Sequence, residues 1–316
     1  MKAQSRRGEC RSVARGARKV QTSTMVIATH NTNWIPSPYD APFAAIQMAV
    51  EAAIAEDTLP LGDISVTHLN AAETGSFAIA TRSDGVFAGS AVAAHALFLL
   101  VPEAAVSWMA SDGQKLNAGE HVCHVTGPIP RLLTAERTVL NFLSHLSGVA
   151  TLTNKFVQQV RHGIGIRDTR KTIPGLRALQ KAAVRAGGGV NHRGSLSEAI
   201  LVKDNHLATV GIGGTVSSIA EYWPGRQVQL ECETYDDVQA AVSSRVDSLL
   251  LDNMSPEEVA RAVALAAGHV RVIEVSGGIT LDNVAQYSIP GVDFISVGAI
   301  THSVLALDFG LDALPG

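Results

Sequence analysis

The second half of the chain carries a repeated pattern that restricts its fold more than any other feature. Apolar runs that end in polar residues alternate there with segments of helical periodicity. Six such runs occupy residues 164–168, 199–203, 228–231, 248–252, 270–276 and 294–298. Strands that alternate with helices in this way are parallel, with right-handed crossovers. Because a full (β/α)₈ barrel needs eight strands, the runs predict an α/β fold with an incomplete or seven-stranded β/α barrel over residues 141–298.

Residues 37–140 lack this alternation and predict a separate N-terminal α/β sandwich domain. The spacing of apolar residues indicates helices at 38–57 and 93–101, and residues 77–81 resemble a strand. Asp84-Gly85 predicts the turn of a hairpin between that strand and residues 86–88. Residues 299–316 are expected to pack back on this domain.

A long helix is expected to follow, from Thr134 to about residue 161. Threonine is favoured at the N-cap, so Thr134 is expected to start it. Arg137 then falls in the first turn, where a basic side chain opposes the helix dipole unless it pairs with Glu136 or a neighbour, or binds a ligand. Gly148 indicates either a break or a close contact in the middle of the helix.

The composition is that of an enzyme with a large core. Hydrophobic residues make up 46% of the 316 residues, charged residues only 17%, and the net charge is −4, which does not favour disorder or nucleic-acid binding. The longest apolar stretch, residues 91–105, is interrupted by His95, Pro102 and Glu103, so no membrane span is expected. Three scattered cysteines without a CxxC motif indicate a reducing compartment, and we expect a cytoplasmic protein.

The N-terminal segment has a composition of its own. Its first 24 residues contain seven Lys/Arg and one acid, Glu9. We expect residues 1–36 to be a basic, disordered extension, or an artefact of an upstream start codon with Met25 as the initiator. An Arg- and Ser-rich leader poor in acids is also typical of organellar targeting segments.

A cationic stretch follows the first predicted barrel strand. Residues 168–207 contain seven Lys/Arg. Arg170, Lys171 and Lys203 come at strand ends, where a parallel barrel places its site. Lys203 follows four apolar residues, so it requires a bound anion or a near carboxylate such as Glu231. His192-Arg193 follows three glycines, which we interpret as a flexible link, whereas the spacing of Arg177, Lys181 and Arg185 predicts a solvated helix face.

Carboxylates end the middle strands. Glu231 and Asp252 could bind Mg²⁺, or hold sugar hydroxyls and stabilise a developing cation. A helix cap is an equally good interpretation of Asp252. Glu233 shares the strand face of Glu231, and its role stays open, as does that of Glu274.

The last two strands end in small residues. Ser276-Gly277-Gly278 and Val297-Gly298-Ala299 each lead from a strand into a helix, where glycine lets the backbone approach an anion. We therefore predict a phosphate site there rather than ordinary tight turns. No nucleophile elbow, P-loop, dinucleotide fingerprint or HExxH motif occurs, and His121 and His124 alone are too few for a metal site.

Four ordered motifs together resemble the quinolinate phosphoribosyltransferase family, whose members are also called nicotinate-nucleotide pyrophosphorylase (carboxylating). They are Glu136-Arg137-Thr138, Asp168-Thr169-Arg170-Lys171-Thr172, Asn191-His192-Arg193 and Lys203-Asp204-Asn205-His206. The resemblance covers roughly residues 40–312. It implies transfer of phosphoribosyl from phosphoribosyl pyrophosphate (PRPP) to quinolinate with loss of CO₂, an Mg²⁺ requirement, and a homodimer or larger assembly with shared sites.

The resemblance also implies residue roles. Quinolinate would contact Arg170, Thr172, His192, Arg193 and Lys203, with Arg137 supplied by the neighbouring subunit. Lys171, Glu231 and Asp252 would act on PRPP, with Mg²⁺ near the two carboxylates, and Lys203 would share the chemistry. The 5′-phosphate would lie on Ser276, Gly277, Gly278, Val297, Gly298 and Ala299, with His302 nearby. Two alternatives stay open: a relative on the same fold that uses another base, as in molybdate-transport operons, and a non-catalytic barrel that senses a nucleotide.

Overall fold

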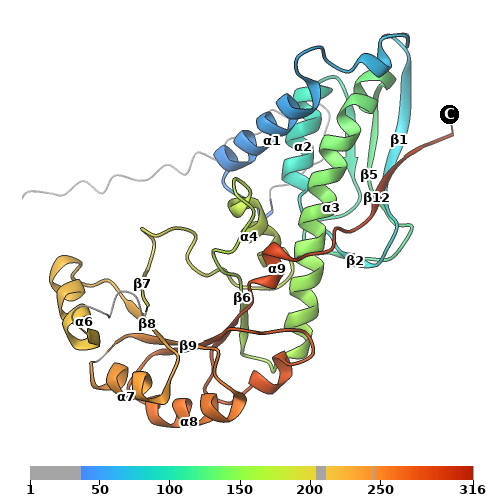
Figure 1. Cartoon of the computed structure of the whole chain (residues 1–316). Helices are drawn as coiled ribbons and strands as arrows, with labels where there is room; N and C mark the ends of the chain where they lie inside the picture. Colours follow the sequence, from blue (N-terminus) through green and yellow to red (C-terminus); the bar gives the residue numbers. More distant parts are fainter. Residues whose placement is uncertain (1–36, 204–210, 245, 316) are drawn as a thin grey trace, which may run out of the picture.

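The computed structural model describes residues 37–203, 211–244 and 246–315, so the expected basic extension and the Asp204-Asn205-His206 motif lie outside it. Figure 1 shows an N-terminal domain at one end of the long helix α3 (Ile129–Gln159) and a β/α barrel at the other. The expected domain boundary at residue 140 falls inside α3, which packs against elements of both parts.

The N-terminal domain contains a four-stranded antiparallel sheet covered by helices. Its strand order is β12-β1-β5-β3, and the helices are α1, α2 and the first half of α3. The bounds are α1 (Phe43–Thr58), η1 (Ile64–Val66), β1 (Thr74–Thr81), α2 (Ser90–Leu100), β3 (Ala105–Trp108), β5 (His121–Pro128) and β12 (Phe309–Ala313). The C-terminal strand β12 pairs with β1, so the end of the chain returns to the first domain.

The hairpin expected at Asp84-Gly85 is wrong. β2 (Gly85–Val86) pairs with β4 (Lys115–Leu116), and β1 pairs with β5 and β12 instead. A Cβ at Gly85 would lie 2.7 Å from both Leu307 and Thr151 side-chain atoms. Glycine is therefore needed here for close packing, not for a tight turn.

The N-cap expected at Thr134 is also wrong, because α3 begins five residues earlier with Pro130 in its first turn. The Thr134 hydroxyl donates within the helix to Pro130 O at 3.0 Å and contacts Asp63 Oδ2 at 3.0 Å. Arg137 consequently lies well inside α3, so the dipole argument does not apply to it. Gly148 allows a close contact rather than a break, since a Cβ there would lie 2.3 Å from Leu305 O.

Among the residues that the structure describes, the barrel has six parallel strands in the order β6-β11-β10-β9-β8-β7. Their bounds are β6 (Gly165–Arg167), β7 (Ile200–Val202), β8 (Val228–Cys232), β9 (Ser248–Asp252), β10 (Val272–Ser276) and β11 (Phe294–Ser296). A parallel bridge from Arg167 to Val190 adds a seventh position beside β6. No pairing between Val190 and β7 occurs within the described ranges, so the predicted α/β fold with an incomplete barrel is confirmed.

Helices follow the barrel strands along the chain, and the alternation of side chains along each strand decides which residues face the barrel interior. The helices are α4 (Arg177–Ala186), α6 (Gly211–Tyr222), α7 (Tyr235–Ser243), α8 (Pro256–Ala266), η2 (Val284–Tyr287) and α9 (Ala299–His302). Leu249, Leu251 and Val275 are fully buried. Residues that alternate with such buried positions along the strands face the barrel interior, and Glu231, Leu250 and Asp252 are among them. Within the part of the chain that the structure covers, no helix is long and apolar enough to span a membrane.

The half-buried carboxyl of Asp40 gives a pH-dependent prediction. Burial raises the pKa of Asp40 from 3.8 to about 6; an N–H of Ser37 opposes this and Asp112 adds to it. The folded state thus binds the Asp40 proton more tightly than the unfolded state does. The stabilisation of the fold by this proton is complete below pH 3.8 and is lost as the pH rises through about 6. Asp40→Asn should therefore raise the unfolding midpoint near neutral pH but not near pH 4.

Thermal unfolding of wild type and Asp40→Asn between those two pH values measures this difference. The exposed Asp57 at the end of α1 supplies the control Asp57→Asn, which should follow wild type. Parallel wild-type and Asp40→Asn curves would contradict the assignment.

Candidate active site

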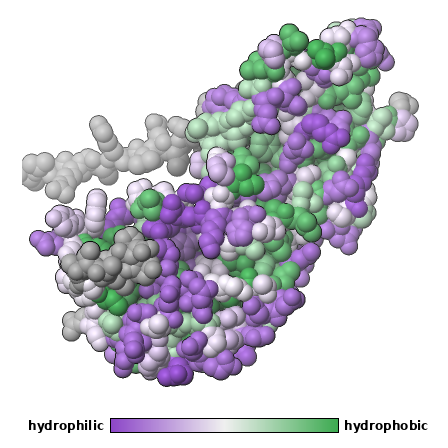
Figure 2. Space-filling view, in the orientation of Figure 1, coloured by the Kyte–Doolittle hydropathy of each residue, from purple (hydrophilic) through white to green (hydrophobic). Residues whose placement is uncertain are grey.

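The strand carboxyl ends enclose a polar cavity of about 340 Å³. Hydrophilic side chains gather along this edge of the barrel, facing the N-terminal domain (Figure 2). The cavity brings together eight of the expected site residues: Arg170, Lys171, His192, Arg193, Lys203, Glu231, Asp252 and Ser276. Thr169, Leu201, Leu250, Glu274 and Ser296 complete its lining.

Lys203 forms an ion pair with Glu231, as expected from its position after an apolar run. The Glu231 carboxylate is 9% exposed and the Lys203 side chain 44%, so the ammonium group still reaches the open cavity. Lys203 directly follows β7 and Glu231 lies near the end of β8. These strands are parallel neighbours, so the ends of both lie at the same edge of the barrel.

Three cations of the lining, Arg170, Arg193 and Lys203, form the cationic wall of the cavity. Arg193 donates through Nη1 to Ala199 O at 2.9 Å. Burial lowers the pKa of Arg193, nearby Arg170 acts in the same direction, and Glu231 opposes them. Two guanidinium groups held together in this way are stabilised by an anion between or beside them.

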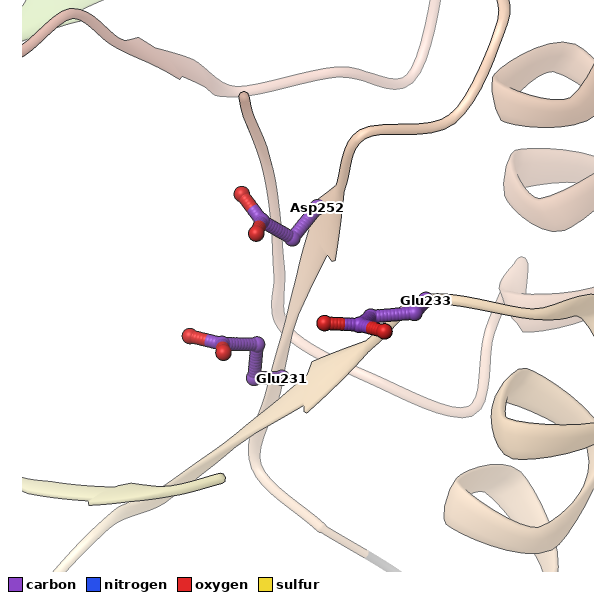
Figure 3. A group of neighbouring side chains, drawn as sticks. All are labelled: Glu231, Glu233 and Asp252. Carbon is purple, nitrogen blue, oxygen red and sulfur yellow. The ribbon is translucent and has the colours of Figure 1, made fainter. Parts of the chain in front are cut away.

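Three carboxylates gather at the ends of β8 and β9. The side chains of Glu231, Glu233 and Asp252 point into the same space (Figure 3), and one oxygen from each lies within 4.8 Å of the others. Such an all-oxygen set suits a hard divalent cation. The pair predicted from the sequence thus gains Glu233 as a third member.

The glycine loops are fixed by neighbouring strands. Gly277 and Gly278 both have positive φ, and a Cβ on Gly277 would lie 2.2 Å from Asn253 Oδ1. A Cβ on Gly298 would lie 3.2 Å from Lys171 Cδ and 3.0 Å from His302 Nε2. The Thr301 hydroxyl donates to Lys171 O at 2.7 Å. The turn Val297-Gly298-Ala299 and Lys171 are therefore adjacent at one side of the cavity mouth.

Two expected quinolinate residues lie outside the cavity lining. Thr172 Oγ1 accepts a hydrogen bond from Arg177 Nε at 2.9 Å, which uses its hydroxyl within the loop. Arg137 lies on α3 with its side chain 72% exposed, 3.7 Å from Glu136. The structure places neither residue in the cavity lining.

The solvated face predicted for α4 is wrong. Lys181 is 7% exposed and forms a buried ion pair with Asp168. Burial raises the pKa of Asp168, and the charge of Lys181 opposes that rise. Arg177 donates to Gly194 O at 3.0 Å, and Arg185 to Asn191 Oδ1 at 2.6 Å. The helix packs against α3 with its other face, so its charged face turns toward the loop that carries His192 and Arg193.

The flexible glycine link is also wrong. A Cβ on Gly187 would lie 2.4 Å from Ala150 O, and one on Gly189 would lie 2.8 Å from Thr153 Cγ2. These glycines let the loop pack tightly on α3. Asp168 then fixes the next residues, accepting from Asn191 Nδ2 at 2.6 Å and from His192 N at 2.8 Å.

A cluster of polar side chains around Glu274 in the barrel interior was not predicted from the sequence. Arg167 donates to the fully buried Glu274 at 2.8 Å, Gln229 donates to the same carboxylate at 2.9 Å, and Ser296 donates to its other oxygen. The available signal was a charged residue inside each of two otherwise apolar strands, Arg167 in the first and Glu274 in the fifth.

A barrel mouth with cations facing carboxylates beside glycine turns defines an enzyme that joins two anionic substrates. The models of the quinolinate phosphoribosyl transferase N-terminal and C-terminal domains match residues 63–147 and 149–312. The chain therefore belongs to the quinolinate phosphoribosyltransferase family.

Individual relatives agree with this family. A nicotinate-nucleotide pyrophosphorylase (carboxylating) of Mycobacterium leprae is 39% identical over 86% of this chain and 99% of its own. A mitochondrial quinolinate phosphoribosyltransferase (decarboxylating) of Nicotiana tabacum is 34% identical over 90% and 88%. The structure of the nicotinate-nucleotide pyrophosphorylase from Francisella tularensis is similar with a TM-score of 0.83 and 36% identity, covering 89% of this chain and all of that one.

Proposed function

We propose that the protein is a quinolinate phosphoribosyltransferase of de novo NAD biosynthesis. It transfers phosphoribosyl from PRPP to quinolinate with decarboxylation, giving nicotinate mononucleotide, pyrophosphate and CO₂. The observation that carries this proposal is the single cavity in which Arg170, Arg193 and Lys203 face Glu231 and Asp252, on the fold of this family.

The cationic wall binds the two quinolinate carboxylates. Arg170, Arg193 and Lys203 supply charge-assisted donors, which are stronger than neutral ones. His192 lies beside them in the lining. Thr172 acts indirectly, by holding Arg177 at the start of α4.

The opposite side of the cavity binds PRPP. The 5′-phosphate lies on the backbone of Ser276-Gly277-Gly278 and Val297-Gly298-Ala299, with His302 beside Gly298. Lys171, which is adjacent to Gly298, neutralises charge on the departing pyrophosphate.

This arrangement fits the reaction without a protein nucleophile. The pyridine nitrogen attacks ribose C1 as the C1–O bond to pyrophosphate breaks, so positive charge develops on the ribose opposite Glu231 and Asp252. The new pyridinium nitrogen then stabilises the carbanion left on the adjacent ring carbon when the carboxylate leaves as CO₂, and that carbon takes up a proton from water. The protein's contribution is therefore positioning and charge stabilisation.

Magnesium is the cofactor that the donor set suits. Glu231, Glu233 and Asp252 offer hard oxygen ligands within 4.8 Å of one another. One carboxylate oxygen of Glu231 is also paired with Lys203. Bound there, Mg²⁺ would neutralise phosphate charge of PRPP.

We also propose a homodimer or larger assembly in which Arg137 serves a neighbour's site. Its side chain is 72% exposed. Exposed apolar residues of the same region support an interface: Leu61 is 80% exposed, Ile64 66% and Leu133 36%, and Asp63 bonds to Thr134 one turn from Arg137.

Hybrid subunits test this assembly. Arg137→Ala and Lys203→Ala should each be strongly impaired alone, whereas mixing them should restore part of the activity, because one site of a hybrid dimer keeps both residues. Activity is measured after verified subunit exchange. Absence of any recovery would count against a shared site.

The cytoplasm is the compartment we propose. Cys123 and Cys232 are free and buried, and burial raises the pKa of each thiol to about 12. Such thiols are unreactive and need no oxidising environment.

The activity itself is tested with PRPP, Mg²⁺ and either quinolinate or nicotinate, following CO₂ and mononucleotide. We expect turnover with quinolinate and not with nicotinate. Turnover of nicotinate alone would favour a relative that uses another base, and nucleotide binding without turnover would favour a sensing barrel.

A further inference from the structure

A chain of hydrogen bonds runs from the barrel interior to the cationic wall of the cavity. It starts at Glu274, which is fully buried, and continues through Gln229 to His192. Glu274 and His192 both line the cavity, so the chain ends beside the proposed quinolinate site.

The contacts of Glu274 fix the direction of the chain. Glu274 is held by Arg167 at 2.8 Å and forms a salt bridge with it, and a carboxylate only accepts hydrogen bonds. The Gln229 amide must therefore turn its NH₂ group to Glu274, at 2.9 Å. Its carbonyl oxygen is then left to face His192 Nε2 at 3.1 Å.

The histidine completes the sequence of donors and acceptors. Because Gln229 Oε1 only accepts, His192 Nε2 must carry the proton, and Glu274 Oε1 lies a further 3.5 Å from it. The other ring nitrogen, Nδ1, accepts from the main-chain N–H of Arg193 at 2.7 Å. A proton on Nδ1 would oppose that N–H.

We propose that Glu274 and Gln229 are positioning residues that hold His192 with a proton on Nε2 and none on Nδ1, and thereby fix the Arg193 main chain at the quinolinate site. The inference rests on the proposed function, because it takes Arg193 as a contact of a substrate carboxylate. Both ring nitrogens of His192 have partners within the protein, so His192 serves to orient Arg193.

The tautomer is measured first, on unliganded wild-type protein with isotope-labelled histidine. NMR of the imidazole nitrogens should show His192 with Nε2 protonated and Nδ1 unprotonated. His192→Gln identifies the signals by their loss. If His192 of the wild-type protein carries its proton on Nδ1, or exchanges between the two forms, the proposal is overturned before any variant of Gln229 or Glu274 is measured.

Kinetics of Gln229→Leu then test the positioning role. Leucine has a similar size but removes the acceptor of His192 Nε2–H, while Arg167 and Ser296 still hold Glu274. KM for quinolinate should rise about tenfold, KM for PRPP should stay within about twofold of wild type, and the tautomer signals should change. Glu274→Gln, which lets the amide of Gln229 turn, should change both readouts in the same direction.

Gln227→Leu is the control, because Gln227 directly precedes the same strand but has no part in the hydrogen-bond chain from Glu274 to His192. It should leave both readouts unchanged. An unchanged tautomer in Gln229→Leu, or a changed tautomer with unchanged KM for quinolinate, overturns the proposal. Failure of the proposed function is seen separately, as absent turnover or as an Arg193→Ala variant with wild-type quinolinate affinity.

Discussion

Replacing Lys203 by methionine is expected to lower kcat/KM for quinolinate by about a hundredfold. The ammonium group supplies a charge-assisted bond to a substrate carboxylate, worth about 1.5–3 kcal/mol, which corresponds to roughly 10- to 150-fold. It also pairs with Glu231, whose carboxylate is only 9% exposed. Its loss leaves that carboxylate facing an anionic substrate.

Steady-state kinetics and calorimetric titration with quinolinate measure the effect. Lys155→Met, at an exposed position of α3, is the control and should behave as wild type. Adding Glu231→Gln to Lys203→Met should recover part of the binding, because the repulsion is removed, but not the turnover. Wild-type quinolinate affinity in Lys203→Met would refute the role of this lysine.

Replacing Lys181 by methionine is expected to lower the free energy of unfolding by about 3–5 kcal/mol. Lys181 and Asp168 have exposures of 7% and 0%, so the change leaves a buried carboxylate without its cation. Lys181 Nζ also donates to His192 O at 2.9 Å, and Asp168 accepts from His192 N. The loop that carries Arg193 should therefore loosen as well.

Denaturant unfolding of four proteins separates these contributions. Asp168→Asn combined with Lys181→Met should be more stable than Lys181→Met alone, because no unpaired charge remains. Lys155→Met should stay within about 0.5 kcal/mol of wild type. If Lys181→Met were as stable as this control, the lysine would be solvated, as the helical spacing of the sequence suggested.

The strand-end residues were predictable for a simple geometric reason. Period-2 alternation and parallel connections require residues at the ends of successive strands to meet at one edge. Lys203 and Glu231, on neighbouring strands, therefore form the ion pair that the sequence indicated. The same rule brought Arg170, Asp252 and Ser276 into the cavity lining.

Predictions that depended on which surface covers an element failed. The spacing of Arg177, Lys181 and Arg185 shows that they share a face, but not that this face meets a loop instead of water. Glycines gave the same difficulty: Gly85 and Gly187 resembled a turn and a flexible link, yet both are sites of close packing. A glycine in a sequence does not distinguish a need for unusual φ from a need for space.

The sequence by itself determined the α/β fold, the strand positions, the family and most of the residues in the cavity, because periodicity and motif order are properties of the chain alone. Only the tertiary structure decided where α3 begins, which cations are buried, and how Glu274 is linked to His192 through Gln229. Those features depend on partners distant in sequence, and a hydrogen bond or ion pair exists only once the fold has excluded water and brought both groups together.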